Sequence, residues 1–174
     1  KTSIINSFVR NIELKKGASI KNIYEGFFPF TQNAKLYYFL YGKNGFRAYQ
    51  VLISNEHVNE FIDDLIQIIK KYSADITIIG IKPFRGEQKF LQFCRNGVSI
   101  ILEMKNSRNN TNFLAKLDEL TITYDGLPYI IKDSRLPKNV VEKCYPQFKE
   151  FQKVLDKIDP DRIFTSHISK QLEL

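Results

Sequence analysis

Two consecutive strand–helix–strand units between residues 46 and 131 constrain the fold more than any other feature of the chain. In the first unit, β-forming side chains alternate over residues 46–53, which predicts a strand. Apolar residues then recur at the i, i+3, i+4, i+7 spacing of an amphipathic helix over residues 58–72. Isoleucines recur within residues 76–81 and predict the second strand.

The second unit has the same order of elements. Apolar residues predict a strand over residues 98–104, a helix over residues 113–120 and a short strand over residues 127–131. The mostly polar residues 82–89 predict a loop between the two units. Side chains able to cap the two helices precede them: Ser54 or Asn55, and Thr111 or Asn112.

This order is typical of the ferredoxin-like split βαβ arrangement, which belongs to the α+β class. It predicts a four-stranded antiparallel sheet with both helices on one face. The opposite face, called the open face below, must be covered or must bind something. The side chains expected on the open face are Tyr49, Ile79 or Ile81, and Ile101.

Further helical segments are predicted on both sides of this unit. Helical spacing of apolar residues appears within the N-terminal segment 1–45. An amphipathic helix is predicted over residues 137–158, and Pro146 should break or kink it. We therefore expect three parts: the N-terminal segment, a ferredoxin-like domain at 46–131 and a C-terminal segment at 132–174.

Composition favours an ordered domain with a core of its own. Of the 174 residues, 43% are apolar and 26% are charged, and the net charge of +7 comes from scattered lysines and arginines. Cys94 and Cys144 lack metal-ligand spacing, so we expect no metal site, no disulfide and a reducing compartment. The first residue is Lys1 rather than Met, and we expect the chain to be a piece of a longer protein.

The polar block at residues 129–135 is the strongest indication of chemistry in the sequence. Lys132 follows Tyr129 by three residues, and a lysine beside an aromatic hydroxyl is suited to holding an anionic group. For Asp133 and Arg135 we favour a local salt bridge over a catalytic role.

The chain carries an ordered series of motifs that resembles a known family. The series comprises Tyr129-Ile130-Ile131-Lys132-Asp133-Ser134-Arg135, Cys144-Tyr145-Pro146, Asp159-Pro160-Asp161-Arg162-Ile163-Phe164 and Leu172-Glu173-Leu174, with Gly42, Gly45-Phe46, Tyr49-Gln50 and Lys82 upstream. It resembles the C-terminal part of the decaprenylphosphoryl-ribose 2-oxidases, which are FAD-dependent flavoproteins of the vanillyl-alcohol oxidase superfamily. The resemblance covers roughly residues 27–174.

The resemblance implies an FAD-dependent oxidoreductase that acts on a CH–OH group of a sugar-like substrate. FAD would be bound mainly by an N-terminal domain that is absent from this chain, so the chain alone is expected to be inactive. Residues 46–131 would form a cap over the substrate. Residues 132–174 would return to the FAD domain and, without it, expose an apolar patch that favours self-association.

The resemblance also assigns roles to individual residues. Lys132 would be the catalytic cation at the pyrimidine end of the flavin, with Tyr129 beside it in the cofactor site. Gln50 and Lys82 would line the substrate pocket. Ser99 and Ile101 belong to the same pocket but depart from the family, which carries an amide and a cysteine at those positions.

The resemblance further implies a sugar or a lipid-linked sugar as substrate and a reductase partner for a two-step epimerisation. The expected location is the cytoplasm or the inner face of the membrane. Lactone and alditol oxidases of the superfamily typically carry His and Gly before the lysine, and the Lys132-Asp133-Ser134-Arg135 block argues against them.

Two alternatives remain open from the sequence. A basic ferredoxin-like sheet is also how several RNA-binding modules are built, but the strand at 98–104 contains no Phe or Tyr to stack on a base, and no nucleic acid is expected. A small ligand-binding domain of the same topology is the other alternative.

Overall fold

The computed structural model describes residues 20, 22, 23, 38, 39 and 41–174. The helical segment predicted within residues 1–45 therefore lies almost entirely outside the described residues. The elements of the central unit are β1 (Phe46–Ser54), α4 (Val58–Tyr72), β2 (Ile76–Phe84), β3 (Gly97–Lys105), α5 (Arg108–Thr123) and β4 (Leu127–Pro128). In the described part of the chain they form one antiparallel sheet with the order β2-β3-β1-β4. The predicted α+β, ferredoxin-like fold is confirmed.

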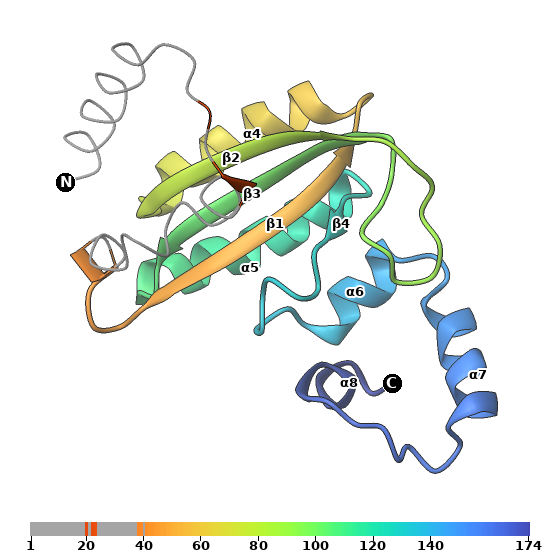
Figure 1. The fold of residues 1–174 in the computed structure, drawn as a ribbon. Helices are drawn as coiled ribbons and strands as arrows, with labels where there is room; N and C mark the ends of the chain where they lie inside the picture. Colours follow the sequence, from red (N-terminus) through yellow and green to blue (C-terminus); the bar gives the residue numbers. More distant parts are fainter. Residues whose placement is uncertain (1–19, 21, 24–37, 40) are drawn as a thin grey trace.

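Helices α4 and α5 lie side by side on one face of the sheet, as predicted (Figure 1). Their apolar stripes pack on alternate residues of β1 and β3, which are the central strands. The side chains at the centre of this core are fully buried: Val51, Ile53, Phe61, Ile100, Leu102, Phe113 and Leu117. Each buried side chain of this size contributes about 1.5–3 kcal/mol to folding. A shift of one residue in strand pairing would turn these side chains away from the helices, so their burial fixes the register of the sheet.

The structure corrects the predicted membership of the open face. Tyr49 is only 1% exposed, and its hydroxyl shares a 2.9 Å hydrogen bond with Thr121 of α5, so it faces the helices. Ile79 and Ile81 lie opposite the helix-facing residues of β3, yet they remain exposed because β2 is an edge strand. Ile101 alternates with the buried core residues of β3 and lies on the open face, as predicted.

Several element boundaries also differ from the prediction. Lys82 was predicted in a loop but lies in β2, where Pro83 is tolerated because an edge strand can leave a backbone donor position unused. Residue His57 precedes α4 without a side-chain cap. Ser107, not Thr111 or Asn112, caps α5. The last strand ends at Pro128; Tyr129 still donates one backbone hydrogen bond to Gln50 of β1, and residues 130–132 then form a turn.

The C-terminal segment forms α6 (Lys138–Cys144), α7 (Phe148–Ile158) and α8 (His167–Leu172). The predicted break at Pro146 is confirmed, since α6 ends and α7 begins on either side of it. The Tyr145 hydroxyl donates a 2.8 Å hydrogen bond to the Pro128 carbonyl and ties α6 to the end of β4. Helix α8 was not predicted; it begins at a capping box formed by Ser166 and Ser169.

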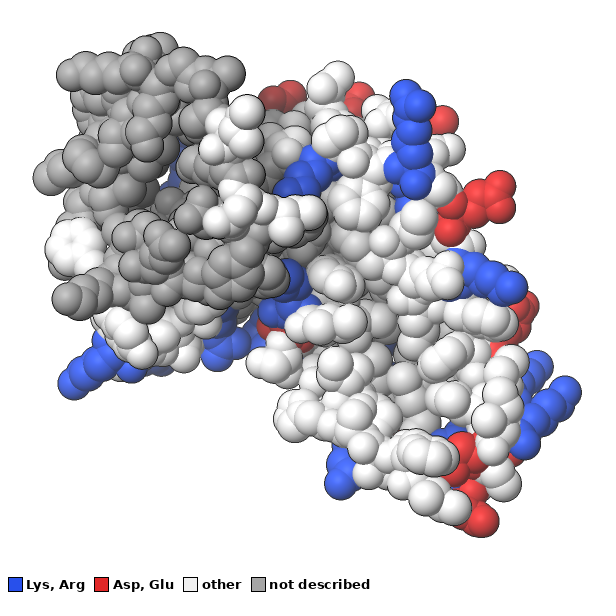
Figure 2. All heavy atoms as spheres, viewed as in Figure 1, with Lys and Arg blue, Asp and Glu red and all other residues white. Residues whose placement is uncertain are grey.

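The end of the C-terminal segment exposes large apolar side chains. Ile158 is 75% exposed, Ile163 76% and Phe164 86%. Uncharged atoms occupy much of the visible surface around α6, α7 and α8, and charged groups lie mostly toward its rim (Figure 2). An exposed apolar surface on this segment is therefore present, as predicted.

No helix in the described part of the chain is long and apolar enough to cross a lipid bilayer.

The two cysteines should differ in reactivity. Cys144 is buried on α6, and burial, with the negative charge of Asp118 as a smaller cause, raises the pKa of its thiol to about 12. Cys94 is partly exposed in the loop after β2. Because the thiolate is the reactive species, a disulfide reagent should modify Cys94 quickly and Cys144 only after unfolding. The absorbance of the thiol released from the reagent should show that one cysteine reacts quickly in buffer and that both react quickly in urea. Two cysteines that react equally fast in buffer would contradict the burial of Cys144.

Candidate functional site

The four residues predicted to line a substrate pocket lie together on the open face. Gln50 of β1 lies opposite Ile101 of β3, and Lys82 of β2 lies opposite Ser99 of β3. The Gln50 side-chain amide donates a 2.9 Å hydrogen bond to the Ser99 hydroxyl. We call these four residues the polar row, although Ile101 supplies an apolar position within it. Sequence reasoning placed them in one site through the resemblance, and the sheet register brings them together.

Tyr129 borders the polar row from the far side of β1. Its backbone N–H donates a 2.7 Å hydrogen bond to the Gln50 carbonyl. Its ring stacks on Phe93 with centroids 4.6 Å apart, and Phe93 meets Phe84 edge-on at 5.6 Å. Phe84 ends β2 on the face that carries Lys82. The two phenylalanines were missed because they are partners only in the folded structure.

Lys132 lies at the wall of an open cavity of about 500 Å³. The cavity lies where the first residues of β1 approach the turn after β4, and its lining comprises Phe46, Arg47, Ala48, Glu103, Asn106, Ile131, Lys132, Asp133 and Ser134. Lys132 is exposed, and within the described residues its ammonium makes no hydrogen bond or ion pair. Its backbone N–H donates to the Tyr129 carbonyl at 3.0 Å, so the two predicted cofactor-binding residues are neighbours in one turn.

The cavity contains a carboxylate that sequence reasoning missed. Glu103 lies on the open face of β3, opposite Ala48, and accepts a 2.9 Å hydrogen bond from the Tyr41 hydroxyl. Ala48 and Glu103 of the lining precede Gln50 and follow Ile101 on the same face of the sheet, so the cavity and the polar row share that face. A carboxylate and an ammonium on the walls of one cavity provide acceptors and donors for a hydroxylated ligand.

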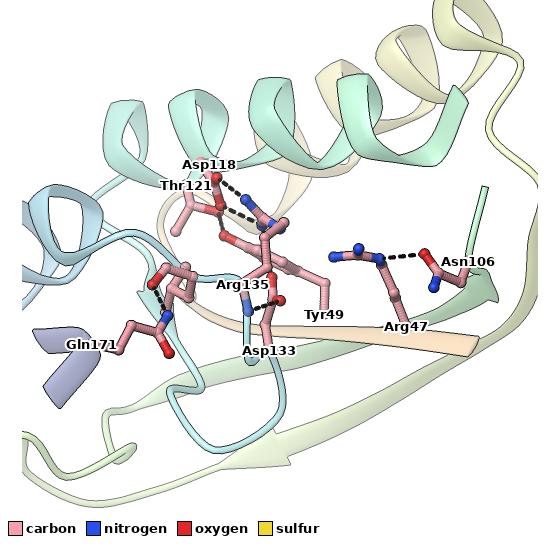
Figure 3. A network of polar contacts seen from close by, with 9 residues as sticks. Arg47, Tyr49, Asn106, Asp118, Thr121, Asp133, Arg135 and Gln171 are labelled. Carbon is pink, nitrogen blue, oxygen red and sulfur yellow. Dashed lines mark hydrogen bonds and ion pairs between the residues drawn. The ribbon is translucent and has the colours of Figure 1, made fainter. Parts of the chain in front are cut away.

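Behind the cavity, Arg135 joins two buried carboxylates (Figure 3). It donates to Asp118 of α5 through Nη1 at 2.7 Å and Nη2 at 3.1 Å, and to Asp133 through Nη2 at 2.7 Å. Asp118 is 5% exposed and Asp133 6%. Burial raises the pKa of Asp118, and the hydrogen bond from Arg135 opposes that rise. The predicted Asp133–Arg135 salt bridge is confirmed. Asp118 was missed, although an acid between Leu117 and Leu120 of a helix is a recognisable signal.

Comparison with known proteins supplies the family relationship. Residues 92–172 match the family model described as D-arabinono-1,4-lactone oxidase. The chain is 28% identical to the decaprenylphosphoryl-beta-D-ribose oxidase of Mycolicibacterium smegmatis over 136 aligned residues. The aligned region covers 77% of this chain and 29% of that protein. A protein described as an uncharacterized protein in the mprA 5' region of Streptomyces coelicolor is 28% identical over 90 residues, 51% of this chain and 24% of its own length.

Both named matches are oxidases, and they support an FAD-linked oxidoreductase fragment. The resemblance inferred from the ordered motifs is therefore confirmed. The chain spans less than a third of the length of the relatives it matches.

Two of the three matches carry the names of different oxidases. The family model carries the name of a lactone oxidase, the group that the Lys132 block argued against, whereas the curated relative is a ribose oxidase. The matched region contains Ser99, Ile101, Tyr129 and Lys132, but Gln50 and Lys82 precede it. The match to the oxidase family model thus extends over the turn that carries Lys132, and the substrate follows from neither name. Among the described residues, no group of three His, Cys, Asp or Glu is arranged to hold a metal.

Proposed function

We propose that the chain is the substrate-binding part of an FAD-dependent oxidoreductase that oxidises a CH–OH group of a sugar-like substrate. Residues 46–131 would cover the substrate, and residues 132–174 would pack on an FAD domain. The observation that carries the proposal is the placement of Lys132 at an open cavity whose lining residues Ala48 and Glu103 share a sheet face with the polar row. The comparisons support the flavin-linked class.

The residues around Lys132 fit a flavin edge. The ammonium has no partner among the described residues and lines a cavity large enough for part of a planar ring. FAD, when bound, supplies the acceptor for the hydride that leaves the substrate carbon as its hydroxyl becomes a carbonyl and the hydroxyl proton passes to solvent. Lys132 would stabilise the negative charge that this transfer brings to the pyrimidine edge. Tyr129 would hold the turn through its bond to Gln50 and its stacking on Phe93.

The polar row supports a hydroxylated substrate. Ser99 is only 2% exposed and accepts from the Gln50 amide, so it would orient Gln50, whose amide can donate and accept hydrogen bonds. Lys82 is a cation suited to a phosphate or a hydroxyl. Ile101 makes the centre of the row apolar. Because Ser99 and Ile101 differ from the amide and cysteine expected by resemblance, we propose a sugar-like substrate that differs from that of the ribose oxidase. If it is lipid-linked, the enzyme would work at the inner face of a membrane, and a separate reductase would complete an epimerisation.

Flavin absorbance tests the proposal directly. The protein that carries this chain should be purified with its flavin and titrated anaerobically with polyprenyl-phosphate sugars and with free sugars. We expect bleaching of the oxidised flavin band by at least one sugar, because oxidation of the CH–OH group reduces the flavin. Absence of flavin from the purified protein would contradict the proposed class. Flavin that no sugar or polyol bleaches would contradict the substrate class alone.

The side chains in the middle of the open face argue against the nucleic-acid-binding alternative. The open-face side chains of β3 in the middle of the strand are Ser99, Ile101 and Glu103. None of them can stack on a base, and the Glu103 carboxylate would repel a phosphate backbone.

A further inference from the structure

Lys132 lies in a short turn that is anchored on both sides. On one side, Tyr129 is bonded to the Gln50 carbonyl of β1. On the other side, Asp133 and Arg135 are bound to α5 through Asp118. Lys132 itself has no described side-chain partner. The position of its ammonium therefore depends on how firmly the two anchors hold the backbone of the turn.

The second anchor fixes backbone as well as side chains. One Asp133 carboxylate oxygen accepts a 3.0 Å hydrogen bond from the Arg135 backbone N–H, and the other accepts from the Arg135 guanidinium. The Asp133 carbonyl accepts from the Leu136 N–H at 3.1 Å. The Leu136 carbonyl in turn accepts from the Gln171 side chain of α8 at 2.6 Å (Figure 3). The residues that follow Lys132 are thus linked to both α5 and α8.

Stability alone does not account for this buried ionic group. Desolvating three charged groups costs free energy that their attraction repays only in part, and apolar residues of similar size often serve stability equally well. The Nε of Arg135 is buried without a described hydrogen-bond partner, which adds to the cost. The planar guanidinium instead fixes geometry. Its two hydrogen bonds to Asp118 set the orientation of Arg135, and Arg135 in turn sets the orientation of Asp133.

We propose that Arg135 is a positioning residue that sets the location of the Lys132 ammonium by clamping the turn to Asp118 of α5. This inference rests on the proposed function, in which Lys132 acts at the flavin. Arg135 itself touches neither the cavity nor a reacting atom. A misplacement of about 1 Å in a group that acts on the transition state can cost about 10²-fold in rate, so a loosened clamp should affect the reaction even when the fold persists.

The experiment compares Arg135→Lys, Lys132→Ala and the double variant in the flavin-loaded protein. Lysine keeps the charge of Arg135 but cannot make the two-pronged contact. We expect Arg135→Lys to slow flavin reduction, per bound flavin, by about 10–10²-fold. In the Lys132→Ala background the same change should have almost no further effect, because the clamp acts through Lys132. Lys116→Gln is the matched control, since it breaks an exposed ion pair on the same helix α5.

A second readout does not depend on activity. Hydrogen–deuterium exchange of the peptide that covers residues 129–137 should speed up at least tenfold in Arg135→Lys and remain unchanged in Lys116→Gln. If Arg135→Lys fails to fold, Asp133→Asn weakens the same clamp and should give the same pattern. Slower reduction in Lys132→Ala together with an unchanged rate in both clamp variants would overturn the positioning role alone. Equal slowing by Arg135→Lys with and without Lys132 would also overturn it, whereas no slowing in Lys132→Ala would overturn the proposed function.

Discussion

Replacing Lys132 by alanine should slow flavin reduction by about 10²–10³-fold, which is the usual loss when one preorganised electrostatic group is removed from an active site. The structure places Lys132 at an open cavity with no described side-chain partner, so the ammonium is available to a ligand. The melting temperature should change little, because an exposed side chain without a partner contributes little to stability. Stopped-flow absorbance of the flavin, normalised to flavin content, measures the rate.

Lys70 offers a matched control for this experiment. It is an exposed lysine in the last turn of α4, remote in sequence from the cavity lining. Lys70→Ala should leave both the rate of flavin reduction and the melting temperature unchanged. A Lys132→Ala protein that retains its flavin and is reduced at the parent rate would remove Lys132 from the mechanism.

Replacing Gly97 by alanine should destabilise the fold by about 3 kcal/mol, at the upper end of the range for overpacking. A Cβ atom at this position would lie 2.1 Å from the carbonyl oxygen and 2.9 Å from the carbonyl carbon of Ile53. Both are backbone atoms of the neighbouring strand, so relief requires β1 and β3 to move apart at this point. Urea unfolding followed by circular dichroism measures the free energy of unfolding.

Gly80 provides the contrast for Gly97. A Cβ at Gly80 would lie 2.6 Å from a methyl group of Ile101, which is a side-chain atom that can move by rotation. Gly80→Ala should therefore destabilise the fold by about 1 kcal/mol. If the two substitutions reduce the free energy of unfolding equally, the close approach of the backbones at Gly97 does not govern stability.

The periodic patterns of the sequence were sufficient to predict the architecture. A period of two over residues 46–53 and a period of 3.6 over residues 58–72 are local consequences of strand and helix geometry, so they can be recognised without a partner. Their repetition predicted the four-stranded sheet, and Pro146 predicted the break between α6 and α7 because a proline removes a helical donor wherever it lies. The ordered motifs around Lys132 indicated a flavin-linked oxidoreductase, and both named comparisons match oxidases.

Which side chains meet was decided only by the tertiary structure. The sequence of β1 has β-forming residues on both faces, so the packing of α5 against Tyr49, rather than the pattern, determined which face is covered. The register of β3 between β1 and β2 placed Gln50, Ser99 and Lys82 together. Asp118 and Arg135 were joined by the packing of α5 against the turn after β4. The physical reason is the same in each case: strand register, face and buried ion pairs depend on residues distant in sequence, whereas helical and strand periodicity are properties of the local chain.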